Sequence, residues 1–118
     1  MRDPRMSVFK ATDAFTVEAY RVAGRVKNDG LAGEIRRTVI RSGGALVAAS
    51  ASAPGGSLER EHLERACASL AEGRYYLYLA RRFGVLDPKR YRALTLRQDA
   101  ALRELQLLLQ QPARGKPP

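Results

Sequence analysis

The sequence predicts an all-α protein, an up-down-up-down antiparallel four-helix bundle. Apolar residues recur with helical spacing in four segments, residues that start or stop helices bound the segments, and no stretch alternates apolar and polar residues as strands do. A chain of 118 residues with 45% hydrophobic and 28% charged residues has the composition of one small globular domain. We expect a flexible N-terminus at residues 1–11, the bundle at residues 12–111 and a disordered basic tail at residues 112–118.

The first helix is predicted from about residue 14 to residue 27. One helical face carries apolar residues at i, i+4, i+7 and i+11: Phe15, Ala19, Val22 and Val26. Asn28, Asp29 and Gly30 end this helix, because Asn and Gly tolerate the left-handed backbone and Asp can cap the next helix.

The second helix begins at Leu31 and carries further apolar residues at Ile35, Val39 and Leu46. Gly43 and Gly44 each cost about 1 kcal/mol relative to alanine inside a helix, so either the helix kinks there or another backbone packs closely against it. We favour close packing. The small and breaking residues of segment 48–56 end the helix.

The third helix begins with Ser57 as a plausible N-cap, followed by glutamates that favour the positive end of the helix dipole. One apolar stripe consists of Leu63, Cys67, Leu70, Leu77 and Ala80. A second, adjoining stripe consists of Tyr76, Leu79 and Phe83. A helix that packs only within its own bundle needs one stripe, so the surplus predicts contact with another copy of the chain.

The fourth helix follows a clear break in which Gly84 ends the third helix, Asp87 caps the fourth and Pro88 takes the first helical position. It extends to about Gln110, and Pro112 closes it. Its apolar positions are Tyr91, Leu94, Ala101, Leu102, Leu105, Leu108 and Leu109.

The net charge of +9 follows from 21 Lys and Arg against 12 Asp and Glu. Residues 73–103 hold eight basic and two acidic residues, and residues 21–41 hold six and two. The two loops of these regions lie at the same end of an up-down bundle, which predicts a strongly positive end. Phosphate-rich partners bind such a surface, and the arginine fork suits phosphate. The predicted contacts are Arg36, Arg37, Arg41, Arg74, Arg81, Arg82, Lys89, Arg90 and Arg97. Arg25, Lys27 and Arg92 are expected beside them.

Catalysis is not expected, because the sequence has no Gly-rich phosphate loop, paired His ligands or nucleophile elbow. One histidine, His62, and one cysteine, Cys67, do not make the usual zinc site, so we expect no metal and no cofactor. Cys67 is interpreted as a small buried residue and Glu72 as an ion-pair partner of an arginine. The N-terminus has no export signal. A cytoplasmic location follows as an expectation.

Tyr75 and Tyr78 lie beside Arg74, Arg81 and Arg82 in the sequence. They could stack on unpaired bases, but the interpretation we favour places them in the core or in a subunit interface.

Three segments resemble the bacterial four-helix-bundle family named after 23S rRNA intervening sequences: LAGEIRRTVI (31–40), ACASLAE (66–72) and LYLARRFGVL (77–86). The resemblance covers about residues 12–110. It implies a homopentameric ring around a central channel. A related branch comprises the accessory variability proteins of diversity-generating retroelements, which bind a reverse transcriptase and its RNA or DNA.

The chain departs from that family at two places. SGGALVAA (42–49) stands where the family commonly has an I-P-x-N-I-A-E-G element, and AFTVEAY (14–20) lacks the usual tryptophan. The leading hypothesis is therefore a non-catalytic, homo-oligomeric bundle that binds RNA or DNA, with a reverse transcriptase as a possible partner. The alternative is a scaffold whose arginines pair with an acidic protein.

Overall fold

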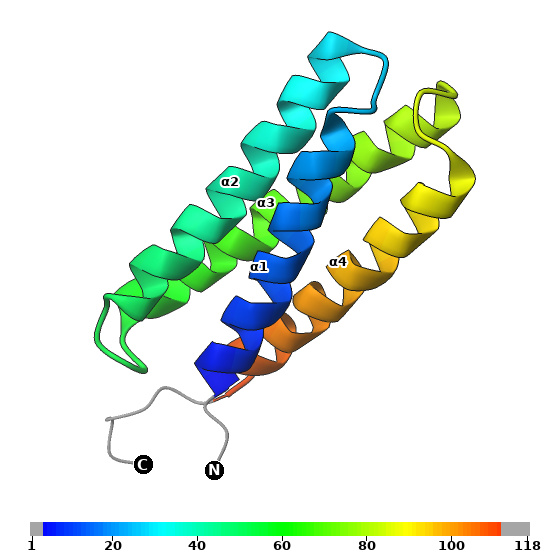
Figure 1. Cartoon of the computed structure of the whole chain (residues 1–118). Helices are drawn as coiled ribbons and strands as arrows, with labels where there is room; N and C mark the ends of the chain where they lie inside the picture. Colours follow the sequence, from blue (N-terminus) through cyan, green and yellow to red (C-terminus); the bar gives the residue numbers. More distant parts are fainter. Residues whose placement is uncertain (1–3, 112–118) are drawn as a thin grey trace.

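Capping residues and apolar stripes divide residues 4–111, the part that this computed structural model describes, into four helices. These are α1 (Pro4–Ala23), α2 (Asp29–Ser50), α3 (Ser57–Arg82) and α4 (Pro88–Leu109). Successive helices run in opposite directions, and each packs against two neighbours around one core (Figure 1). The predicted all-α class with four helices is confirmed, and the described residues contain no strand.

The predicted break between α3 and α4 is confirmed in detail. Gly84 has a φ of 74°, and beyond it the Val85 amide donates to the Ala80 carbonyl oxygen at 3.0 Å. The Asp87 carboxylate accepts the Arg90 backbone N–H at 3.2 Å, and Pro88 follows as the first residue of α4. The connection therefore has a fixed shape that positions the charges of both helix ends.

Two other helix starts differ from the predictions. Asn28, rather than Asp29, caps α2, since its side-chain oxygen accepts the Leu31 N–H at 3.0 Å. Ser57 is the first residue of α3, and Gly56 takes the cap position without a side-chain bond. Glu59 serves this end instead by accepting the Gly55 N–H at 2.8 Å.

The prediction of a flexible segment at residues 1–11 is wrong for residues 4–11, which form the first two turns of α1. The apolar face of α1 continues upstream of Phe15, and Val8 is only 1% exposed in the core. The same helix ends at Ala23, four residues before the predicted end, although Val26 in the connection stays buried. Residues 1–3 and the predicted tail at residues 112–118 lie outside the described part.

The glycine pair of α2 does not pack closely against another backbone within residues 4–111. A Cβ at Gly43 or Gly44 would have no neighbour within 4 Å, and α2 continues through both to Ser50. Close packing occurs at Gly73 of α3, where a Cβ would lie 2.9 Å from Thr38 Oγ1. The helix pair α2 and α3 therefore makes its close contact at a glycine to which the sequence analysis gave no role.

The core follows the predicted apolar faces. Phe15, Ile35, Leu70, Leu77 and Leu105 are at most 1% exposed. The fully buried Gln98 donates to the Leu70 carbonyl oxygen at 2.7 Å, which ties α4 to α3.

The second stripe of α3 is mostly used inside the monomer, contrary to the prediction. Tyr76 and Leu79 pack against the core, and only Phe83 is largely exposed. Exposed apolar side chains occur on all four helices, and α1 and α2 carry Phe9, Val17, Tyr20, Ile40 and Val47 among them.

Candidate nucleic-acid interface

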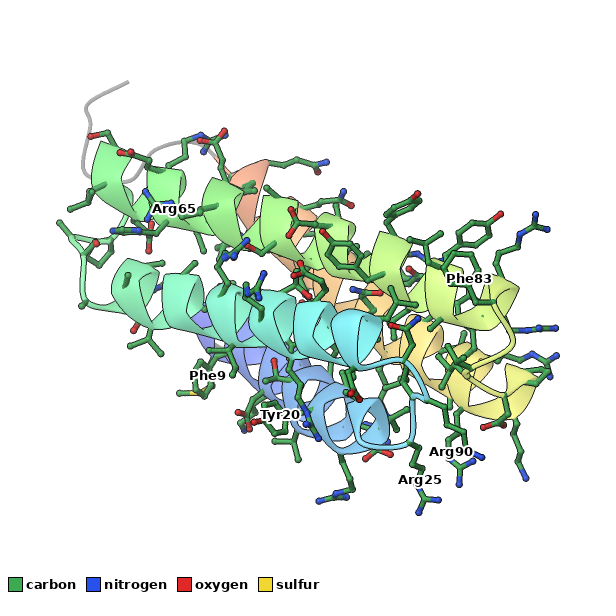
Figure 2. All side chains as sticks on the ribbon, turned by 90° about the horizontal axis from the view of Figure 1, so that it is seen from above. Phe9, Tyr20, Arg25, Arg65, Phe83 and Arg90 are labelled. Carbon is green, nitrogen blue, oxygen red and sulfur yellow. The ribbon has the colours of Figure 1, made fainter. Side chains whose placement is uncertain are left out.

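The two connections that carry basic residues meet at one end of the bundle. Arg25 and Lys27 from the α1–α2 connection share a shallow depression with Gly84–Asp87 and Arg90 from the α3–α4 connection. Figure 2 shows Arg25 and Arg90 together at this end and Arg65 toward the other end. The sequence-based prediction that the two loops lie together is confirmed.

We call residues 24–30 and 81–92 the basic end. These two segments hold seven Lys and Arg against two Asp. The seven cations are Arg25, Lys27, Arg81, Arg82, Lys89, Arg90 and Arg92. All seven are exposed. Because like charges are concentrated on a small surface, the basic end has a positive potential that extends over about a Debye length.

Most cations of the basic end have no partner within residues 4–111. Only Arg90 has one, since its guanidinium donates to Asp87 Oδ1 at 2.8 Å. This hydrogen bond, together with the backbone N–H of Arg90, holds the pKa of Asp87 below its ordinary value. The other six side chains make no hydrogen bond or ion pair to a described residue, so their donors face solvent.

Five of the nine predicted contact residues are instead engaged within the chain. Arg36 donates to the Tyr20 carbonyl oxygen at 3.2 Å and lies 4.5 Å from the centre of the Tyr20 ring. Arg37 pairs with Glu34 on the same helix, and Arg90 with Asp87. The remaining two link helices.

Those two are Arg41, which lies 3.4 Å from Glu72, and Arg74, which lies 3.1 Å from Asp99. The expected ion pair of Glu72 is therefore present, although this carboxylate is 45% exposed. Arg41 is twelve residues into α2, about 18 Å along the axis, so it does not belong to the basic end.

The other four predicted residues, Arg81, Arg82, Lys89 and Arg97, have no partner among the described residues. Three of them lie at the basic end, whereas Arg97 is about 14 Å along α4 from its start. Arg25, Lys27 and Arg92 were omitted from the predicted contacts, yet they are exposed and have no partner within residues 4–111. Their position beside residues that end or start helices was the sequence signal that could have placed them at the basic end.

Tyr75 and Tyr78 are not core residues, because they are 56% and 45% exposed. Their rings are nearly parallel, with centroids 6.4 Å apart and planes at 26°. Tyr76 between them turns toward α2, where burial and the carboxylates of Glu72 and Glu34 raise its pKa.

Groups that could perform acid–base or metal chemistry are dispersed. Within residues 4–111, no three His, Cys, Asp or Glu side chains lie close enough to hold a metal ion. Cys67 is half-buried rather than buried, and burial, together with nearby Glu64, raises its pKa. The exposed His62 ring nitrogen is 3.4 Å from Arg65.

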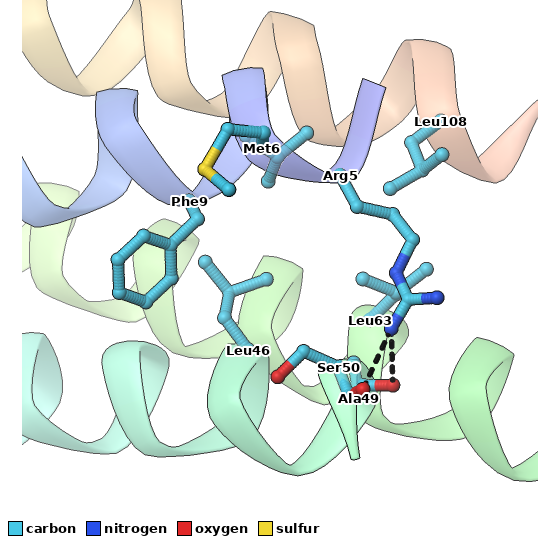
Figure 3. A pocket seen from close by; sticks show the side chains of 9 residues that line it. Arg5, Met6, Phe9, Leu46, Ala49, Ser50, Leu63 and Leu108 are labelled. Atoms are coloured by element: carbon cyan, nitrogen blue, oxygen red, sulfur yellow. Dashed lines mark hydrogen bonds between the residues drawn. The ribbon is translucent and has the colours of Figure 1, made fainter. Parts of the chain in front are cut away.

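An apolar pocket lies at the end opposite the basic end (Figure 3). Met6, Phe9, Leu46, Leu63 and Leu108 line it. Its one charged side chain, Arg5, points across the rim and donates to the carbonyl oxygens of Ala49 and Ser50. This arginine is therefore occupied by the end of α2.

Comparison with known protein families finds no family model that matches the chain, and comparison with curated proteins finds no match. No helix in residues 4–111 combines the length and the apolar character that a membrane span requires. The candidate interface therefore depends on geometry and charge.

Proposed function

We propose that this protein is a non-catalytic nucleic-acid-binding bundle that contacts the phosphates of RNA or DNA through its basic end. The observation that carries the proposal is the group of six cations without a partner within residues 4–111: Arg25, Lys27, Arg81, Arg82, Lys89 and Arg92. A cation that folding does not use can exchange its counterion for a phosphate without breaking an internal pair. The proposed interface therefore forms without rearrangement of the bundle.

The proposal includes self-association into a ring-shaped homo-oligomer, which the family resemblance gives as a pentamer. The exposed apolar surface of α1 and α2 supports this step, since Val17, Ile40 and Val47 are each about half exposed. Gly43 and Gly44 lie between Ile40 and Val47 on the same helix face and leave room for a neighbouring helix. A ring would repeat the basic end and increase its avidity for a long polyanion.

By the same resemblance, the nucleic acid is proposed to be that of a retroelement, with its reverse transcriptase as a protein partner in the cytoplasm. The exposed cations of the basic end support this extension. Co-purification of the protein with a reverse transcriptase encoded near it would test the extension separately.

Binding to labelled RNA and DNA, measured by fluorescence anisotropy between about 50 and 200 mM salt, tests the proposed function. We expect log K to fall linearly with log salt. Arg25→Ala together with Lys27→Ala should weaken binding and reduce the magnitude of the salt slope by about 2, because each phosphate contact contributes about 1.

The matched control is Lys10→Ala with Arg103→Ala. Both side chains are exposed and unpartnered among the described residues, and both lie away from the basic end. The control removes the same charge, so equal effects of the two double variants would contradict a localised interface. If an acidic protein competes for the basic end and RNA does not, the result would favour the alternative scaffold function.

A further inference from the structure

We infer that the exposed tyrosine pair of α3 stacks on unpaired bases, so that the protein prefers single-stranded over double-stranded nucleic acid. This inference rests on the proposed function, since the basic end supplies the attraction to the phosphates. The tyrosines add a contact that only unpaired bases can make.

The tyrosines belong to one exposed stripe of α3. Ala68, Ala71, Tyr75, Tyr78 and Arg82 follow one another at spacings of three and four residues, which places them on the same helix face. All five are exposed. Since Ala68 and Ala71 are small, nothing on the stripe itself covers the rings from the side of the helix start.

The geometry of the two rings fits consecutive bases. Their centroids are 6.4 Å apart and their planes differ by 26°, so bases that are themselves nearly parallel can lie against both. Phe83, which is 62% exposed, adds a third exposed ring at the end of the helix. Exposed aromatic rings next to cations are typical of surfaces that bind single strands.

Charge along α3 gives the bound strand a direction. Its start carries Glu59, Glu61 and Glu64 against Arg60 and Arg65, and Glu59 and Glu61 are paired with Arg5 and Arg65, so this part of the helix has no excess of cations to offer a phosphate backbone. Its end carries Arg81 and Arg82, neither of which has a partner within residues 4–111. A strand that stacks on the tyrosines would therefore continue toward the basic end, where further phosphates can be neutralised.

A duplex cannot stack on the tyrosines, because its bases are stacked on one another and their faces are inaccessible. It would still bind the cations of the basic end. The inference thus separates two contributions: stacking, which needs unpaired bases, and charge, which does not.

The test compares three probes of about twenty nucleotides at low salt: oligo(dT), an abasic oligonucleotide and a duplex. Tyr75→Ala with Tyr78→Ala should weaken oligo(dT) binding at least about tenfold, since each stacked base contributes about fivefold to 150-fold. Binding of the abasic probe and of the duplex should change less than about twofold, because neither offers a base face.

Two further measurements complete the test. Tyr75→Phe with Tyr78→Phe keeps the rings and should retain oligo(dT) binding. The chain has no tryptophan and five tyrosines, so oligo(dT) should directly quench tyrosine emission in the wild-type protein and quench it less in this variant. Light scattering should give the same oligomeric state for the wild type and both tyrosine variants.

Unchanged oligo(dT) binding by the alanine variant would overturn the inference and leave the proposed function intact. If the alanine variant lost binding to all three probes and also changed its oligomeric state, the inference would be overturned as well, because the tyrosines would then be subunit contacts. Absence of wild-type binding to every probe at low salt would instead contradict the proposed function itself.

Discussion

The two ends of the bundle use their cations in opposite ways. At the end opposite the basic end, Arg5 lies 3.2 Å from Glu59 and bonds carbonyl oxygens of α2, while Arg60 donates to the Leu109 carbonyl oxygen at 2.6 Å. These cations cap the C-terminal ends of α2 and α4 by binding their last carbonyl oxygens. At the basic end, six of seven cations have no partner among the described residues.

The difference shows that the number of arginines does not indicate which of them are available to a ligand, whereas their pairing does. A cation bound to carbonyl oxygens stabilises the fold and cannot leave without cost. An unpaired cation contributes little to folding and is available to a ligand. The two ends should accordingly respond in opposite ways to the same kind of substitution.

The largest effect is expected at Glu59, whose side chain is 10% exposed. Glu59→Ala removes the ion pair with Arg5 and the acceptor of the Gly55 N–H, and should lower the free energy of unfolding by about 2–4 kcal/mol. Urea unfolding followed by circular dichroism measures the change. Glu61→Ala is the control, because Glu61 is 66% exposed and its loss should cost less than about 0.5 kcal/mol.

Between the two ends, Gly73 should be nearly as sensitive. Gly73→Ala places a Cβ 2.9 Å from Thr38 Oγ1, so either Thr38 must give up its present rotamer and its hydrogen bonds to α2 or the two helices must separate, and we expect a loss of about 1–3 kcal/mol despite the better helix propensity of alanine. Gly33→Ala is the control, since its Cβ would meet no atom within 4 Å. Thermal melting measures the effect. If Tm fell equally in both variants, the result would contradict a specific close approach at Gly73.

Much of this fold was predictable, because helix faces and caps are local signals. The apolar positions of α1 and α2, the Gly84 turn and the Asp87 cap all follow from residues within a turn or two of one another. The role of Gly73 was not predictable, since it depends on Thr38 in another helix. Pairing of Arg41 with Glu72 and Arg74 with Asp99 likewise required the relative rotation of the helices.

For the candidate site, the sequence predicted which end is basic but not which cations are free. Arg36 belongs to the same charge cluster as Arg25 by sequence, yet it packs on the Tyr20 ring. The exposure of Tyr75 and Tyr78 also depends on packing, because Tyr76 takes the inward position between them. Helical spacing placed Tyr76 on the second apolar stripe, but it did not decide whether that stripe faces the core or another subunit.

A smaller effect, of opposite sign, is expected at the basic end. Lys89 lies in the first turn of α4, where the helix dipole disfavours a cation, and it has no partner among the described residues. Lys89→Glu should therefore raise the free energy of unfolding by about 0.3–1 kcal/mol while it weakens binding to RNA. Arg103→Glu, near the other end of α4, should give no such gain in urea unfolding. A loss of stability in Lys89→Glu would mean that the basic end serves folding.

The smallest effect concerns Asp87, the acid beside these cations, and it depends on pH. Its hydrogen bonds from the Arg90 side chain and backbone lower its pKa below 3.8, so its contribution to stability is complete above that value and is lost as pH falls through the folded-state pKa. The difference in Tm between wild type and Asp87→Ala should thus be constant near neutral pH and become smaller in acid, where the charge is lost and only the neutral capping hydrogen bond remains.

Asp87→Ser separates the cap from the charge. Serine can still accept the Arg90 backbone N–H but does not ionise, so its Tm should stay below that of the wild type at neutral pH and approach it in acid. Melting curves from about pH 2 to pH 7 measure both variants. If Asp87→Ser matched the wild type throughout, the carboxylate charge would contribute nothing, and the capping hydrogen bond alone would hold the start of α4.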